Sequence, residues 1–273
     1  MGAVTPYHHG ISVTNLAAMR AAAAAIGFTK IEPGAETPRH YANVEGDKIG
    51  QMIAGWLGDE ISTHYVENPA TGQQLDLVEI AARSLVARPG EQPAQGDTTV
   101  GIPCADPDAG YAAMYAAAPE LEFSGPADAG KEDGITFTVD GQRFILTRRA
   151  QPFTIVHYAS SAWPEAKRFY EDVLGACFFQ LPNRGATERY RVENAPGRMD
   201  IEISGTTPIA APSAGKKYPG ANHFRILNLN LDAIPARVEA TGLGTWLFPP
   251  RGGFAQIYGP TNEFIELYDQ SVT

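Results

Sequence analysis

The sequence is poor in cysteine, in long apolar runs and in positive charge. Its 273 residues contain only two cysteines, Cys104 and Cys177, too few for a disulfide framework and without zinc-site spacing. No apolar run approaches the roughly 18 residues that a membrane-spanning helix needs. The 21 Lys and Arg residues against 31 Asp and Glu give a formal net charge of −10, which opposes binding to nucleic acid and to anionic lipid surfaces.

Signals for targeting and for phosphate binding are also missing. The first residues lack the basic and apolar regions of a secretory signal, and no Gly-rich loop of the dinucleotide or P-loop type joins a strand to a helix. We therefore expect a cytoplasmic, globular protein whose partner is a small molecule, with no nucleic-acid or membrane partner. The composition leaves its oligomeric state open.

The residues that are present predict many strands and a few helices. The chain has 28 Gly and 21 Pro, and the apolar runs between them are short and rich in β-branched and aromatic residues. Propensity and capping signals predict four helices. They cover residues 16–26, 108–118, 164–174 and 232–241.

These helices belong to an internal repeat of four units. A strand-like run precedes each helix, and an apolar strand closes each unit. Aligned on the helix starts, the units begin at His8, Thr99, Ile155 and His223, and the equivalent closing-strand residues are Asp76, Ile145, Glu202 and Glu266. The longer first unit carries an insertion, which contains His40 and His64.

The repeated sequence resembles the vicinal oxygen chelate superfamily, which includes glyoxalase I, extradiol dioxygenases and the bleomycin and fosfomycin resistance proteins. The third unit contributes FTIVHYASSAWPEAKRFYEDVLG; the fourth contributes HFRILNLNLDAIPARVEATG and YGPTNEFIELYD. The resemblance implies an α+β fold of four βαβββ modules that form two paired, cup-shaped halves. The short join near residue 150 predicts a first half over 1–149 and a second half over 150–273.

The resemblance also implies a divalent metal ion, Fe, Mn, Zn or Ni, bound by the first residue of strand one and a carboxylate of the last strand. Residue by residue, the implied ligands are His223, Glu266 and Glu202. Unit three departs from the pattern, because Ile155 stands at its strand-one position. The first half is eroded: His8 and Asp76 remain, but Thr99 and Ile145 replace both positions of unit two.

Strand alternation places further side chains beside these positions. His157 shares a face with Ile155, and we expect it to act as an acid or base, with Glu202 as a third metal ligand or a base. Arg225 shares a face with His223 and has three possible partners: a substrate carboxylate, Glu202 or Glu266. The expected substrate-binding residues are Arg225, Trp246, Phe254 and Tyr258, although the aromatic side chains could equally be core.

Three classes of function fit these residues. The first is a metal-dependent isomerase, epimerase or lyase acting on a small oxygen-bearing substrate, which the aromatic residues suggest is planar. The second is an extradiol ring-cleaving dioxygenase, although Ile155 removes one of the two expected histidines. The third is a binding or resistance protein without catalytic activity.

Overall fold

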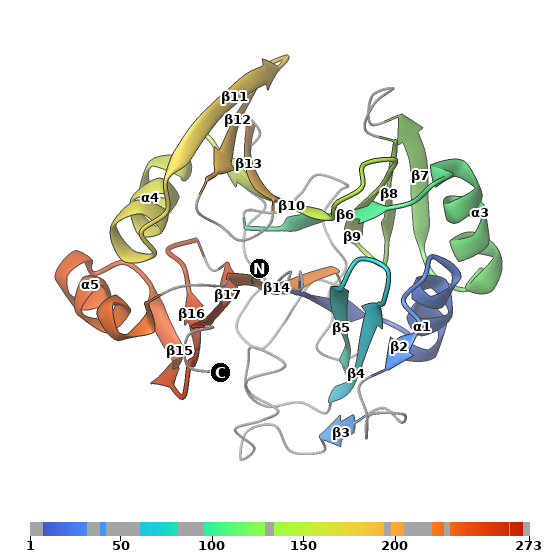
Figure 1. Cartoon of the computed structure of the whole chain (residues 1–273), viewed down its shortest axis with the longest axis horizontal. Helices are drawn as coiled ribbons and strands as arrows, with labels where there is room; N and C mark the ends of the chain where they lie inside the picture. Colours follow the sequence, from blue (N-terminus) through green and yellow to red (C-terminus); the bar gives the residue numbers. More distant parts are fainter. Residues whose placement is uncertain are drawn as a thin grey trace. The chain divides into compact units, whose positions relative to one another are not determined.

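The computed structural model describes residues 8–31, 39–41, 61–80, 96–128, 134–193, 198–204, 220–226, 230–261 and 263–269 (Figure 1). The chain forms two compact units. Unit one contains Met1–Glu91, Thr99–Phe153 and Pro212–Asn222, and unit two contains Gln92–Thr98, Thr154–Ala211 and His223–Thr273. Among the described residues, no helix is both long enough and apolar enough to cross a membrane.

Unit one holds the first two modules. Module one consists of β1 (His8–Val13), α1 (Leu16–Ala25), β2 (Lys30–Ile31), β3 (Arg39–Tyr41), β4 (Ile61–Asn68) and β5 (Gln73–Ile80). Module two consists of β6 (Thr98–Pro103), α3 (Pro107–Ala117), β7 (Phe123–Asp128), β8 (Ile135–Val139) and β9 (Gln142–Thr147).

Unit two holds the other two modules. Module three consists of β10 (Phe153–Ala159), α4 (Trp163–Arg168), the π-helical turn η2 (Phe169–Val173), β11 (Phe178–Arg184), β12 (Thr187–Val192) and β13 (Arg198–Ser204). Module four consists of β14 (Gly220–Ile226), the 3₁₀ turn η3 (Leu231–Ala233), α5 (Ile234–Thr241), β15 (Thr245–Arg251), β16 (Phe254–Tyr258) and β17 (Phe264–Tyr268).

Every module arranges its strands in the same order, with the first strand beside the last. The four orders are β2-β4-β5-β1, β7-β8-β9-β6, β11-β12-β13-β10 and β15-β16-β17-β14. The pairs β1–β5, β6–β9 and β14–β17 are parallel, as a strand-helix-strand crossover requires. The predicted fold of four βαβββ modules is confirmed.

Capping side chains and a left-handed glycine mark the ends of three helices. The Asn15 side chain accepts a hydrogen bond from the backbone N–H of Ala18 at the start of α1, and Asp106 does the same for Ala109 at the start of α3. Gly242, with φ of 66°, ends α5 in the left-handed conformation. Local signals therefore set where these helices begin and end.

Strand register repeats from module to module. In each case the residue facing the closing-strand position lies two residues after the aligned start of strand one. The pairs are Gly10 with Asp76, Gly101 with Ile145, and Arg225 with Glu266. The same offset in module three gives His157 and Glu202, whose side chains approach to 3.9 Å.

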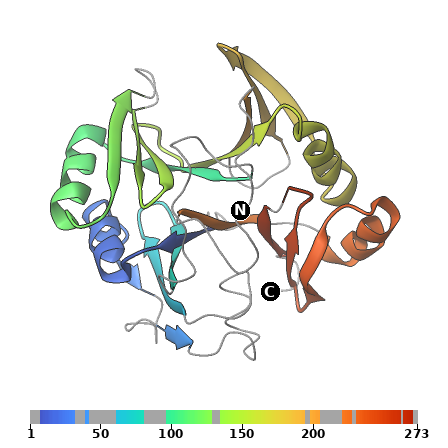
Figure 2. The ribbon, with the colours of Figure 1, turned by 180° about the vertical axis from the view of Figure 1, so that it is seen from behind.

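The core of unit two forms on the helix side of both of its sheets. Helices α4 and α5 lie next to each other in both views of the chain (Figures 1 and 2), and α5 contacts η2. Buried side chains from both sheets join them in one cluster, including Val156, Ile201, Ile257, Ile265 and Leu267. Because strand side chains alternate, the residues between these point away from the core.

Candidate functional site

Unit two presents two polar faces, one on the side of each sheet that points away from the shared core. The module-three polar face carries His157 on β10, Arg189 and Arg191 on β12, and Arg198, Asp200 and Glu202 on β13. The module-four polar face carries Arg225 on β14, Phe254, Gln256 and Tyr258 on β16, and Glu266 and Tyr268 on β17. The apolar neighbours of these residues face the shared core.

Glu202 lies between a cation and an imidazole on the module-three polar face. Its Oε1 atom is 3.3 Å from Nε of Arg189, the residue opposite it on β12. Its Oε2 atom is 3.9 Å from Nδ1 of His157 on β10. All three side chains are partly buried, so water screens their charges less than it would on an open surface.

Asp200 holds two further arginines on the same face. Its side chain is 1% exposed, and it accepts from Nε of Arg191 at 2.9 Å and from Nε and Nη2 of Arg198 at 3.0 and 2.8 Å. Arg191 and Arg198 keep 37% and 24% of their side chains exposed. With Arg189 and Glu202, this face carries three guanidinium groups and two carboxylates.

On the module-four polar face, Glu266 is bonded through both carboxylate oxygens. Arg225 donates to Oε2 from Nε at 3.2 Å and from Nη2 at 3.1 Å, and Gln256 donates to Oε1 from Nε2 at 3.1 Å. The guanidinium carbon of Arg225 also lies 4.3 Å from the ring centre of Tyr268. Of the three partners open to Arg225 in the sequence, it pairs with Glu266.

The aromatic residues divide between the two sides of the module-four sheet. Phe254 lies on the polar face, with its ring centre 5.0 Å from Tyr268 and 5.9 Å from Phe248. Tyr258 shares that face, and burial raises the pKa of its phenol to about 12, so it stays protonated at neutral pH. Trp246 instead packs against the helix-side core.

Two of the three implied metal ligands do not come together. Glu202 and Glu266 lie in different sheets, on faces that both point away from the shared core. His223 lies in β14, but its side chain is outside the described residues. Across the side chains that the structure describes, no group of three or more His, Cys, Asp or Glu residues could hold a metal ion. Because each carboxylate already faces an arginine, the described donors do not fit a divalent ion.

In the first half, module one places histidines and an aspartate on its strands. His8 is buried on β1, with its ring centre 5.6 Å from that of Tyr65, and Asp76 lies on the same face of β5 by register. His64 is buried on β4, whereas the side chain of His40, in β3, is outside the described residues. In module two the corresponding buried residues are Thr99 and Ile145.

The arginines of module three and Gln256 were not predicted from the sequence. Arg189 and Arg191 alternate with the core-facing Tyr190 and Val192 in the run TERYRV, and Arg198 and Asp200 alternate in the same way in RMDIEIS. The period of two was therefore available as a signal. The pairing of β12 with β13, which places the opposite charges face to face, could not be read from the sequence.

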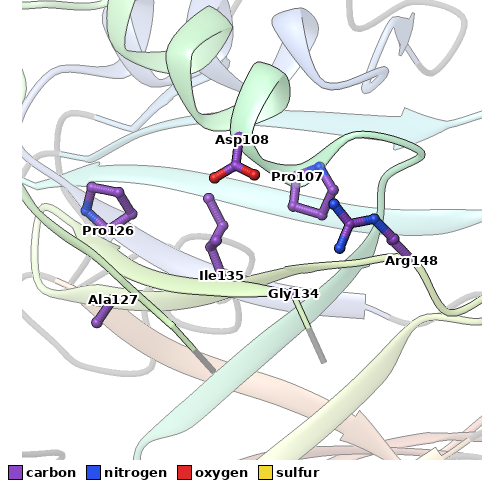
Figure 3. Close-up of a pocket in the computed structure, with 7 residues that line it drawn as sticks. All are labelled: Pro107, Asp108, Pro126, Ala127, Gly134, Ile135 and Arg148. Atoms are coloured by element: carbon purple, nitrogen blue, oxygen red, sulfur yellow. The ribbon is translucent and has the colours of Figure 1, made fainter. Parts of the chain in front are cut away.

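A cavity of about 390 Å³ lies in unit one, beside the start of α3 (Figure 3). Asp108 and Arg148 contribute opposite charges to its wall. The rest of the lining is apolar or glycine: Pro107, Pro126, Ala127, Gly134 and Ile135. None of these residues was predicted as a site residue.

Comparison with known proteins identifies the fold. No family model and no curated protein matches the sequence. Among solved structures, glyoxalase I from Zea mays is 14% identical with a TM-score of 0.57, over 97% of this chain and 92% of that one. A variant of that enzyme has the same identity and coverage and a TM-score of 0.59. A putative dioxygenase from Bacillus subtilis strain 168 is 14% identical with a TM-score of 0.56, over 97% of this chain and 84% of that one. The chain therefore shares the paired βαβββ fold of these glyoxalase I and dioxygenase structures.

Proposed function

We propose that the chain is an enzyme that transfers a proton on a small oxygen-bearing substrate, in the manner of a glyoxalase-like isomerase, epimerase or lyase. The reaction takes place on the module-three polar face. The observation that supports this proposal is the arrangement of His157, Glu202 and Arg189, in which a carboxylate lies between an imidazole and a guanidinium. The fold itself supports the superfamily and no particular reaction.

In the proposed reaction, His157 exchanges the proton with the substrate. An imidazole suits this role because its unperturbed pKa lies close to neutral pH. Glu202 faces Nδ1 of the ring, so it orients His157 and stabilises the imidazolium that forms when the ring takes a proton. Arg189 balances the charge of Glu202, with its Nε atom 3.3 Å from Oε1. General acid-base groups of this kind contribute roughly 10²- to 10⁴-fold to a rate.

The cofactor that the resemblance implies is a divalent ion, which would polarise a substrate oxygen. Its candidate ligands in module four are His223 and Glu266. An ion at Glu266 would have to displace both Arg225 and Gln256 from the carboxylate. The proposed proton transfer therefore does not involve a metal ion.

Proton exchange tests the proposal without knowledge of the natural substrate. The protein is incubated in D₂O with a panel of α-keto and α-hydroxy acids, and loss of the C–H signal is followed by ¹H NMR. The wild type should accelerate exchange of at least one compound, and His157→Gln should slow it by roughly 10²-fold or more. Glu165→Gln, at an exposed position of α4, is the control and should match the wild type. Equal exchange by His157→Gln and wild type would refute the role of His157.

The module-four polar face supports a second candidate, a binding protein for a planar ligand. The ring of Phe254 contacts those of Phe248 and Tyr268, and Arg225 lies over Tyr268, so this face offers a row of flat surfaces. Ligand binding with no exchange of any panel compound would favour this candidate. Oxygen uptake with a catechol would instead favour the ring-cleaving dioxygenase.

A further inference from the structure

We propose that Arg191 and Arg198 form a binding site for an oxyanion group, a carboxylate or a phosphate, of a small-molecule substrate. The proposal rests on the proposed function in one respect, since it places this group on the same module-three polar face as His157. It adds the chemical class of the substrate, which neither the fold nor the acid-base pair specifies.

The first observation is a local excess of positive charge. The ion pairs that the described side chains form on the module-three polar face join three guanidinium groups, those of Arg189, Arg191 and Arg198, to two carboxylates, those of Asp200 and Glu202. The whole chain carries a formal net charge of −10. A positive face on an acidic protein attracts small anions to that face and away from the rest of the surface.

The second observation is the way in which the two arginines are held. A single carboxylate, on the buried side chain of Asp200, accepts from both guanidinium groups. One buried carboxylate thus holds two guanidinium groups beside each other. Arg191 uses only its Nε in this contact, and 37% of its side chain remains exposed for a ligand.

The third observation is the chemistry of the guanidinium group. Its planar fork of N–H donors matches the two oxygens of a carboxylate or phosphate, and such charge-assisted hydrogen bonds are among the strongest in proteins. Because Asp200 already orders both side chains, a ligand would lose less affinity to the ordering of flexible arginines. Register places Arg191 and Asp200 two residues along the strands from Arg189 and Glu202, about 7 Å away on the same face, so a small molecule could reach both groups.

Calorimetric titration tests the site directly. The probes are succinate, inorganic phosphate and the uncharged dimethyl succinate. The wild type should bind succinate or phosphate with an affinity that falls as salt is added, and should not bind the diester. The preferred anion then identifies the source of the oxyanion. If neither succinate nor phosphate binds, the proposal is overturned.

Variants locate the binding. Arg191→Ala should weaken the affinity by roughly 10- to 100-fold, the usual value of a hydrogen bond to a charged group, and Arg191→Lys should recover part of the loss. Arg168→Ala is the matched control, since Arg168 is an exposed arginine on α4. Thermal unfolding checks that the Arg191 variants are folded. Unchanged binding by folded Arg191→Ala, or an equal loss in Arg168→Ala, would show that the anion binds elsewhere.

The two proposals fail in different ways. His157→Gln should lose proton exchange but still bind the anion, because His157 is not part of the Asp200 cluster. Anion binding that depends on Arg191, in a protein that exchanges no proton, would leave this inference standing and remove the proposed function. Proton exchange that is unaffected in Arg191→Ala would leave the proposed function standing and remove this inference.

Discussion

The guanidinium group of Arg225 lies 3.1 Å from the carboxylate of Glu266, on the strand beside it. The resemblance to metal-binding relatives implies a divalent cation at this carboxylate. An arginine there supplies a positive charge from the chain itself, and Gln256 engages the other carboxylate oxygen. The βαβββ fold is thus present, while Glu266 faces an arginine and a glutamine instead of the metal ion that the resemblance implies.

Metal content follows from that contact. Protein purified without chelator should contain far less than one divalent ion per chain by elemental analysis, because Arg225 already occupies the cation position beside Glu266. Added Mn, Fe, Zn or Ni should leave the thermal unfolding temperature unchanged, since binding to the native state alone would raise it. About one tightly bound ion per chain would contradict this prediction.

Removing one partner of the same pair should destabilise the protein. Arg225→Ala leaves the largely buried Glu266 carboxylate without its guanidinium partner, at a cost of about 3 kcal/mol in the free energy of unfolding. The double variant Arg225→Met with Glu266→Gln should recover most of this loss, because no charge is then left buried. Urea denaturation of the wild type, the single variant and the double variant measures both changes in the free energy of unfolding.

The control for that measurement is an exposed ion pair. Lys167 and Glu171 lie on the outer surface of α4 and η2, with N···O of 3.5 Å and 40% and 41% of their side chains exposed. Lys167→Ala should therefore change the free energy of unfolding by less than about 0.5 kcal/mol. A cost for Arg225→Ala as small as this would mean that the pair with Glu266 contributes little to stability.

Glu263 should make stability depend on pH. Its carboxyl is 3% exposed and is bonded to the Tyr158 hydroxyl at 3.0 Å and to the N–H and hydroxyl of Thr261 at 2.9 and 2.6 Å. Burial raises the pKa of Glu263 above its usual 4.5, so folding favours the protonated form. The stabilising contribution is complete below the unfolded pKa and is lost as pH rises through the folded pKa.

Glu263→Gln tests this expectation, because glutamine keeps the shape of the side chain and cannot ionise. As pH rises above the usual carboxyl pKa of 4.5, the free energy of unfolding of the wild type should fall relative to that of the variant. Glu239→Gln, at an exposed position of α5, should follow the wild type. Parallel stability profiles for wild type and Glu263→Gln would show that ionisation of Glu263 has no energetic consequence.

The sequence predicted the modules because their signals are local. A helix cap such as Asn15, a terminator such as Gly242 and the alternation along the strands each act within a few residues, and the four-fold repeat reinforced them. The helix predicted over 164–174 is α4 extended by the π-helical turn η2, and the one over 232–241 begins as the 3₁₀ turn η3. Propensity does not separate these helix types, because they differ only in hydrogen-bond spacing.

The site was harder to predict because it depends on strand pairing. Alternation put His157 on the same face as Ile155, but only the sheet order shows that Glu202 and Glu266 belong to different sheets. Equivalent repeat positions are not neighbours in space. In the same way, the partner of Arg225 was set by the register of β14 with β17, which no local pattern encodes.

The central claim is that the module-three polar face carries the reaction, and two carboxamide variants test it most directly. Glu202→Gln removes the charge beside His157, whereas Glu266→Gln changes the carboxylate of the other face. With the compound that the wild type exchanges fastest in D₂O, Glu202→Gln should lower the exchange rate by roughly 10-fold or more while Glu266→Gln stays close to wild type. Full exchange by Glu202→Gln with loss of exchange in folded Glu266→Gln would contradict the claim and place the reaction on the module-four polar face.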